Sequence, residues 1–272
     1  MTPEHLLPRL CLLLLLLASP ALSQGQQLHL LQSLPINQPQ AISIDRLGQV
    51  YVSDQKNILY KYSPQGEHLF TYSPASQGRL AFVEAWNPAK TLLFYDDRQQ
   101  ITILDRFLTP ITSIRLAALT DGLIRLATIA SDEQFWMLNE SDFSLIKIDP
   151  RYPDARLQTN LNQLLPHASY DFRLLREYQN NLYLLDRNSG IYLFDNMGNF
   201  KKKLPVKGLD YLGFKGDEGY YLKNGSLVFW HLYTLQERVV SLPPARAYRQ
   251  VLVGDQGVYL FSPTQLDIYR LE

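Results

Sequence analysis

The chain has 272 residues, and its 26 basic and 26 acidic side chains leave no net charge. This balance excludes the basic excess expected of a nucleic-acid-binding protein. The single cysteine, Cys11, excludes a disulfide within the chain. The 17 tyrosines favour strands.

Residues 1–23 have the three parts of a secretory signal peptide. Arg9 precedes a leucine run, and Ala21 and Ser23 supply the small residues of a cleavage site. The run is about half as long as the roughly 20 residues of a membrane span. We therefore predict cleavage after Ser23, which leaves a mature chain that is periplasmic or extracellular, without an integral membrane span and without a thiol for catalysis or metal binding. A retained N-terminal anchor is the alternative.

Residues 24–272 contain a short pattern that recurs six times. Its first copy, VYVSD at residues 50–54, is an apolar run that ends in a short polar side chain. The end residues are separated by 42, 43, 47, 38 and 38 positions and are Asp54, Asp96, Asn139, Asp186, Asn224 and Ser262. A period of about 40 residues built from such short runs is typical of a four-stranded propeller blade. Helical repeats need longer segments with apolar residues every three or four positions.

Each of the first five copies divides into four runs, which become strands a to d of a blade. The runs are 41–45, 49–54, 57–63 and 67–73; 80–86, 91–97, 100–106 and 109–116; 124–130, 133–139, 143–149 and 155–161; 172–178, 181–187, 190–196 and 199–205; and 211–216, 219–224, 226–232 and 237–243. The sixth copy has three, 249–255, 257–263 and 265–272, and residues 28–36 offer a spare run.

We therefore predict an all-β, six-bladed β-propeller with four antiparallel strands per blade, formed by residues 24–272 as one domain. Residues 28–36 should complete the last blade and close the ring, because an open ring leaves an unpaired strand edge. The longest step carries extra chain at residues 159–171, with a possible short helix stopped by Pro166. This insertion belongs to the face that holds the d-to-a connections and the b-to-c turns, which we call the loop face. It is either functional or a spacer.

Residues 39–72 resemble a repeat of the NHL type. The matching positions are Pro39, Ile44, Asp45, Gly48, Val50, Tyr51, Val52, Asp54, Asn57 and Gly66. The resemblance implies a six-bladed NHL-like propeller, a group in which many members are binding platforms. It also includes calcium-dependent lactonases, which hold a metal over the central channel with Glu, Asn and Asp. Here the ends of the a strands are Asp45, Glu84, Glu177 and Lys215, and a lysine opposes a hard cation by charge repulsion.

Local motifs give no catalytic residue, metal site or cofactor. The mature histidines, His29, His68, His167 and His231, lack metal-ligand spacing. The six repeat ends suit turns, because Asp, Asn and Ser accept hydrogen bonds from the backbone two residues on. Trp86, Trp136 and Trp230 are predicted to be core residues between blades.

These observations favour a non-catalytic binding or scaffold module for a protein partner in the cell envelope, although an enzyme stays possible. The candidate binding residues on the loop face are Asp54, Asp96, Asp97, Arg98, Glu140, Asp142, Asp186, Arg187 and His167. The alternative is a metal-dependent lactonase-like hydrolase with its site at the mouth of the central channel. A solvated polar rim, or a sugar or peptide sensor, also fits the loop-face pattern.

Overall fold

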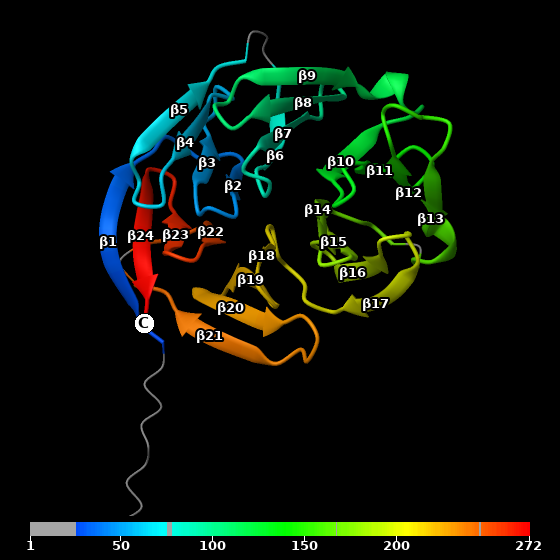
Figure 1. The fold of residues 1–272 in the computed structure, drawn as a ribbon. Coiled ribbons are helices and arrows are strands. Elements are labelled where there is room, and N and C mark those ends of the chain that lie inside the picture. Colours follow the sequence, from blue (N-terminus) through cyan, green and yellow to red (C-terminus); the bar gives the residue numbers. More distant parts are fainter. Residues whose placement is uncertain (1–25, 75–77, 167, 245) are drawn as a thin grey trace, which may run out of the picture.

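The computed structural model describes residues 26–74, 78–166, 168–244 and 246–272. In this part of the chain, 24 strands form six four-stranded antiparallel sheets that stand around a central axis (Figure 1). The predicted six-bladed β-propeller is confirmed. Strand a of each blade is innermost and strand d lies at the rim.

The strands follow the predicted order in every blade. Blade 1 has β2 (Ile42–Ile44), β3 (Val50–Ser53), β4 (Leu59–Tyr62) and β5 (His68–Tyr72). Blade 2 has β6 (Leu80–Glu84), β7 (Lys90–Tyr95), β8 (Gln100–Asp105) and β9 (Pro110–Arg115). Blade 3 has β10 (Ile124–Ile129), β11 (Phe135–Asn139), β12 (Ser144–Ile148) and β13 (Leu157–Asn160).

The second half of the ring repeats this arrangement. Blade 4 has β14 (Phe172–Tyr178), β15 (Asn181–Asp186), β16 (Gly190–Asp195) and β17 (Phe200–Leu204). Blade 5 has β18 (Gly213–Lys215), β19 (Glu218–Lys223), β20 (Ser226–His231) and β21 (Glu237–Ser241). Blade 6 has β22 (Gln250–Val253), β23 (Val258–Phe261), β24 (Gln265–Leu271) and, from the other end of the chain, β1 (Leu28–Pro35).

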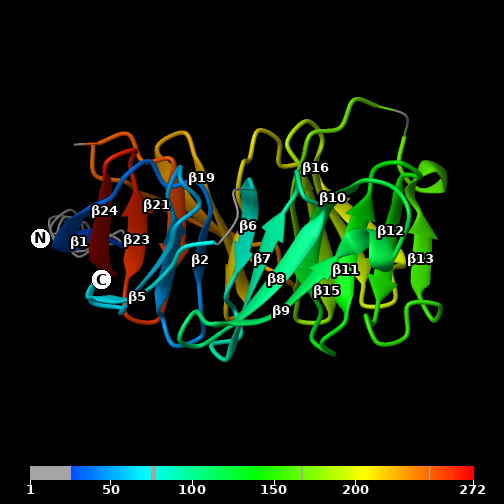
Figure 2. The same ribbon diagram turned by 90° about the horizontal axis from the view of Figure 1, so that it is seen from above.

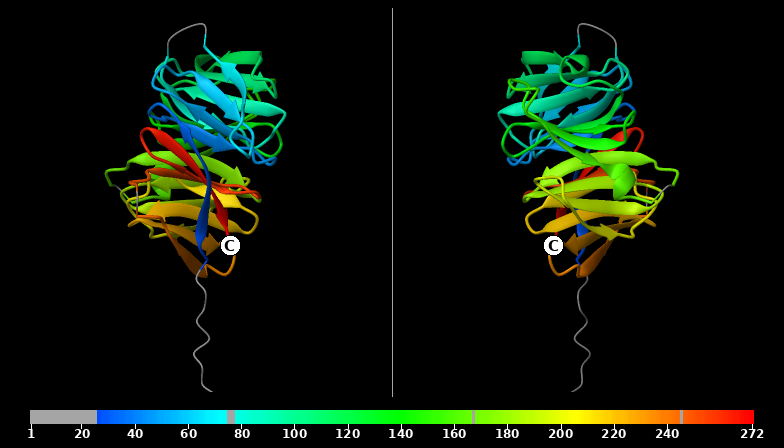
Figure 3. Two further views of the ribbon diagram at one scale, coloured as in Figure 1. Left: turned by 90° about the vertical axis from the view of Figure 1, so that its left-hand side faces the viewer. Right: turned by 90° about the vertical axis from the view of Figure 1, so that its right-hand side faces the viewer.

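The ring closes as the sequence predicts. Strand β1 pairs antiparallel with β24 from Leu28 opposite Leu271 to Pro35 opposite Gln265, with one register shift between Leu30 and Gln32. Figure 3 shows the two strands crossing the same side of the molecule. The pairing covers the strand edge that β24 would otherwise expose to solvent.

The core lies between neighbouring blades. Strands b and c are covered on both faces, so their sequences are continuous apolar runs rather than alternating ones. Trp136 and Trp230 are buried, as predicted. Trp86 packs against the core as predicted, but its side chain is only partly buried and lines a cavity at the channel mouth.

The connections gather along the two flat faces of the disc, which Figure 2 shows from the side. The a-to-b and c-to-d turns share the face opposite the loop face, and we call it the turn face. Contacts between blades join these turns: the Tyr233 hydroxyl bonds Gln179, and Gln65 bonds Gln256.

Helix is confined to two short segments in the described residues. They are the 3-10 turns η1 (Leu116–Ala118) and η2 (Leu161–Gln163), and neither is long or apolar enough to cross a membrane. The expected helix in the insertion is limited to η2. Asn160 caps it by accepting a hydrogen bond from the Asn162 N–H at 2.9 Å, and the buried side chains of Leu161 and Leu165 anchor the segment to the core.

Candidate functional site

Three of the six repeat ends, Asp54, Asn139 and Asp186, accept a hydrogen bond from the backbone N–H two residues on, whereas the Ser262 hydroxyl donates to the Gln265 carbonyl. Asp54 is buried, and its Oδ1 accepts hydrogen bonds from the N–H groups of Lys56 at 2.8 Å and Ile58 at 3.0 Å. Asn139 accepts one from the Ser141 N–H at 3.0 Å. Asp54 therefore has the turn role that its residue type predicts.

Most of the other predicted binding residues also make local contacts. Asp96 forms an ion pair with Arg79, whose backbone N–H donates to Asp97 at 2.9 Å. Asp142 accepts hydrogen bonds from Ser144 and Gln158. The Arg98 side chain lies over Gly78, and Glu140 is exposed. Asp186 accepts a hydrogen bond from the Asp171 N–H, and Arg187 forms an ion pair with Asp210.

The predicted binding set therefore does not converge on one point. Its described members sit in the turns of blades 1 to 4, and His167 lies outside the described residues. A loop-face cavity of about 440 Å³ lies between blades 5, 6 and 1 instead. It is lined by Gln38, Pro39, Gln40, Asp210, Arg249, Gln250, Phe261, Ser262 and Pro263, none of which belongs to the set. A binding role for the set remains a prediction.

A cavity of about 500 Å³ opens at the channel mouth on the turn face. The a-to-b turns of blades 1 to 4 contribute its walls, and none of the predicted binding residues lies on this face. The lining residues are Arg46, Glu84, Trp86, Asn87, Ile129, Ala130, Ser131, Glu133, Glu177, Tyr178, Gln179 and Asn180. Two of the four predicted a-strand ends, Glu84 and Glu177, thus come together here, whereas Asp45 and Lys215 do not.

Glu84 is fully buried and bonded on both carboxylate oxygens. Its Oε2 accepts hydrogen bonds from the Thr128 hydroxyl at 2.5 Å and the Ile129 N–H at 3.3 Å, and its Oε1 lies 3.3 Å from the Arg176 guanidinium. Burial raises the pKa of Glu84, and this effect outweighs the opposing influence of Arg176. The Glu84–Arg176 ion pair therefore fixes the conformation of the channel wall and adds little to the free energy of unfolding.

The substitution Glu84→Gln should test this balance through its pH dependence. Because the pKa of Glu84 is raised above its ordinary value of 4.5 in the fold, the unfolded chain loses this proton first as pH rises. Wild-type stability should therefore fall relative to the variant as pH rises from about 4.5 through the raised pKa. Urea unfolding at several pH values measures the difference.

Glu133→Gln is the matched control for that experiment. Glu133 is exposed, and its hydrogen bond with Lys90 lowers the pKa of its carboxyl. The contribution of Glu133 to the free energy of unfolding should be lost as pH falls. Its effect on stability against pH should therefore have the opposite sign to that of Glu84, and a smaller size. A Glu84→Gln difference that does not change with pH would contradict the proposed balance.

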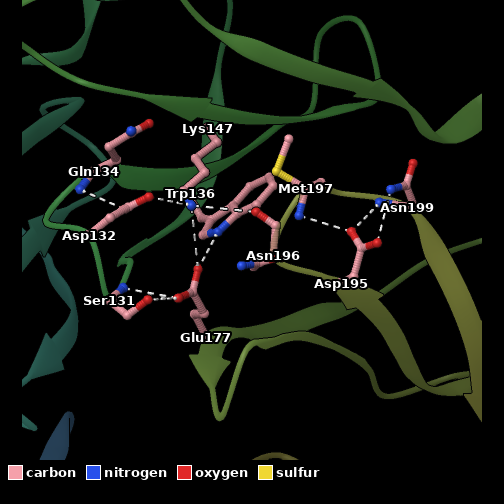
Figure 4. Close-up of polar contacts among 10 residues, drawn as sticks. All are labelled: Ser131, Asp132, Gln134, Trp136, Lys147, Glu177, Asp195, Asn196, Met197 and Asn199. Atoms are coloured by element: carbon pink, nitrogen blue, oxygen red, sulfur yellow. Dashed lines mark hydrogen bonds and ion pairs between the residues drawn. The ribbon is translucent and has the colours of Figure 1, made fainter.

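Glu177 organises a second cluster that joins blades 3 and 4 (Figure 4). Its Oε1 accepts hydrogen bonds from the N–H of Ser131 at 2.9 Å and the hydroxyl of Ser131 at 2.6 Å. Its Oε2 accepts the Trp136 indole N–H at 2.7 Å and lies 3.9 Å from Lys147 Nζ. The buried Lys147 also pairs with Asp132 at 2.7 Å and donates to the Asn196 carbonyl at 3.4 Å.

In blade 1 a second buried lysine also lies beside an aromatic ring and donates to a backbone carbonyl of the next blade. Lys61 Nζ lies 5.1 Å from the ring centre of Tyr51 and donates to the Arg106 carbonyl of blade 2 at 2.8 Å. Lys147 Nζ lies 5.5 Å from the ring centre of Trp136. Both lysines stand between two apolar or aromatic residues of a c strand, in YKY and IKI. This pattern is a sequence signal for a buried lysine that contacts the next blade.

This chemistry suits a rigid channel mouth better than a metal centre. Arg176 and Lys147 lie against the two glutamates that line the cavity. Among residues 26–74, 78–166, 168–244 and 246–272, no three carboxylate, histidine or cysteine side chains form a metal-binding group. The lactonase alternative therefore gains no ligand set from the described residues.

Comparison with known proteins identifies the fold. No family model and no curated protein matches the sequence. Virginiamycin B lyase from Staphylococcus aureus is 10% identical, with 91% of this chain and 100% of that chain covered and a TM-score of 0.62. BamB from Moraxella catarrhalis is 11% identical, with 89% of this chain and 97% of that chain covered and a TM-score of 0.52. The Neurospora crassa Pan2 WD40 domain is 10% identical, with 89% of this chain and 94% of that chain covered and a TM-score of 0.60. The chain is therefore similar in fold to β-propeller proteins of different activities.

Proposed function

We propose that this protein is an exported, non-catalytic β-propeller that binds a protein partner through its turn face. Export rests on residues 1–23, which lie outside the described residues, and N-terminal sequencing should place the mature start at Gln24. The binding role rests on one observation: turns on this face hold large apolar side chains out in solvent.

The clearest cases are the c-to-d turns of blades 2, 4 and 5. Asp105 accepts a hydrogen bond from the Phe107 N–H at 2.8 Å, and Asp195 accepts one from the Met197 N–H at 2.9 Å. His231 Nδ1 accepts the Tyr233 N–H at 3.2 Å. In each turn the residue two positions after the acceptor is exposed, by 50% for Phe107, 56% for Met197 and 62% for Tyr233.

Two further turns present residues of the same kind. Asp45 accepts the Leu47 N–H at 2.9 Å in the a-to-b turn of blade 1, and Leu47 is 61% exposed. In the c-to-d turn of blade 3, Asp149 caps the backbone just before Tyr152, which is 66% exposed. We call Leu47, Phe107, Tyr152, Met197 and Tyr233 the tip residues.

The tip residues have the chemistry of an interface. Phe, Tyr and Met are enriched where proteins meet, and capped turns hold such side chains ready for contact at little entropic cost. In the described residues the turn face exposes these five and Leu235, whereas the loop face exposes only Leu123 and Leu164. Because the tips stand on five blades, the partner must be a folded domain or a long segment.

A pull-down from the native envelope fraction tests the proposal. The triple variant Phe107→Ser, Tyr152→Ser, Met197→Ser should recover at least about tenfold less partner than wild type, because exposed aromatic anchors often carry more than 1 kcal/mol each. The matched control carries Asp97→Asn and Glu140→Gln on the loop face and should bind normally. Loss of the partner in the control alone, or a wild-type protein that runs as a lone monomer at native abundance, would refute the proposal.

A further inference from the structure

The cavity at the channel mouth has an aromatic wall. Trp86 packs edge-on against Tyr178, with 5.4 Å between the ring centres, and both residues line the cavity. Tyr178 is fixed in turn by its hydroxyl, which donates to the Gly216 carbonyl at 2.8 Å, and by stacking on Phe214. The indole is therefore held in place while part of it stays accessible.

The rim of the cavity offers hydrogen-bonding groups that the protein does not use. Asn87 accepts a hydrogen bond from the Ala89 N–H at 3.0 Å, and its amide N–H groups have no partner among the described residues. In the same part of the chain, no ion pair or hydrogen bond engages the side chains of Arg46 and Asn180. These groups supply donors and an amide acceptor around one opening.

The charges below the rim are already balanced. Glu133 pairs with Lys90 at 2.7 Å, Glu84 with Arg176 at 3.3 Å, and Glu177 with Lys147 at 3.9 Å. A strongly cationic ligand would face Arg46, and a strongly anionic one would face the carboxylates. The cavity therefore favours a neutral ligand.

A buried donor lies beside a separate and much smaller cavity behind Trp86. The Nε of Arg176 is buried without a hydrogen-bond partner. Arg176 lines a small cavity of about 20 Å³ that also touches Trp86, Ser43 and Tyr211. This space holds about one water-sized oxygen atom, and an unpaired buried donor is costly unless an oxygen accepts a hydrogen bond from it.

We propose that the turn-face cavity binds a neutral saccharide of one or two rings. The apolar face of the sugar packs on the Trp86 indole, and its hydroxyls exchange hydrogen bonds with Asn87, Asn180 and Arg46. The cavity of about 500 Å³ lies within the usual range for small-molecule sites. Eight of its twelve lining residues are polar or charged, which suits a ligand rich in hydroxyl groups. No tip residue lines this cavity, although the Tyr233 hydroxyl bonds Gln179 in its wall.

Tryptophan fluorescence tests the site directly. Trp136 and Trp230 are buried, so Trp86 should dominate any ligand-dependent change. We would titrate the purified mature protein with maltose, cellobiose and N,N′-diacetylchitobiose, each to about 50 mM, and expect a saturable shift with at least one, with a Kd of about 1 mM or tighter. Calorimetric titration should give the same Kd.

Two variants connect the signal to the cavity. Arg46→Ala changes an exposed side chain and should weaken binding at least about fivefold without a change in melting temperature. Trp86→Ala should abolish binding, with Phe200→Ala as the control that removes an exposed aromatic ring outside the cavity and outside the tip residues. No response to all three sugars, or unchanged affinity in Arg46→Ala and Trp86→Ala, would overturn the saccharide site. The outcome does not depend on a protein partner, so it is separable from the pull-down.

Discussion

Deleting residues 26–36 from a protein that spans residues 24–272 should lower its melting temperature by more than about 10 °C, or abolish its cooperative unfolding. The deletion removes β1 and the seven residue pairs it forms with β24. It also removes the Ser33 hydroxyl, which donates to the buried Asp267 at 2.5 Å, and the Leu34 and Ile36 side chains that pack on the core. Loss of a whole strand should cost about 5 kcal/mol or more, a large part of the total stability.

The control for this deletion keeps the strand and changes only its outer surface. Leu30→Thr and Leu31→Thr alter side chains that are about half exposed, so they should leave the melting temperature nearly unchanged. Differential scanning calorimetry measures both. An unchanged melting temperature after the deletion would show that the ring does not depend on closure by β1.

Glu177→Ala should destabilise the fold by about 3 kcal/mol, because the buried Trp136 indole N–H loses its acceptor and the buried Lys147 loses a carboxylate neighbour. Trp136 Nε1 and the backbone N–H of Ser131 lose their hydrogen bonds, and Lys147 loses one of its two carboxylate neighbours. Urea unfolding should show the loss in the midpoint rather than in the slope.

The neighbouring carboxylate provides the matched control for Glu177. Asp132 pairs with the same lysine at 2.7 Å, but its side chain is 45% exposed. Asp132→Asn should therefore cost less than about 1 kcal/mol. Equal effects of the two substitutions would contradict the role of Glu177 as the organiser of the joint between blades 3 and 4.

Much of the fold could be predicted because its signals are local. The run that ends at Asp54 recurs in every blade, and its residue types fix both the buried strand and the turn that follows. Closure by residues 28–36 followed from a missing strand. The helix expected near Pro166 was overestimated, because a cap at Asn160 and buried leucines hold a single turn there.

The turn face could not be predicted in the same way. Glu177 and Lys147 are 30 positions apart and meet only because two blades stack in a particular register. The pattern of apolar residues in the sequence does not predict how neighbouring blades are aligned. A single apolar residue in a turn, such as Met197, looks like an extension of the strand before it, and only the structure reveals its exposure. The polar residues at the b-strand ends are visible in the sequence, so the predicted binding residues lie on the loop face, opposite the turn face.

Site-specific photocrosslinking in the native host tests most directly whether the turn face is the binding surface. A photoreactive phenylalanine analogue would replace Phe107 or Tyr152 on the turn face, and Asp97 or Glu140 on the loop face. We expect a discrete crosslinked product, with the same partner identified, from both turn-face positions and none from the loop-face positions. Crosslinks to a discrete partner from the loop-face positions alone would contradict the proposal and restore the face that the sequence first indicated.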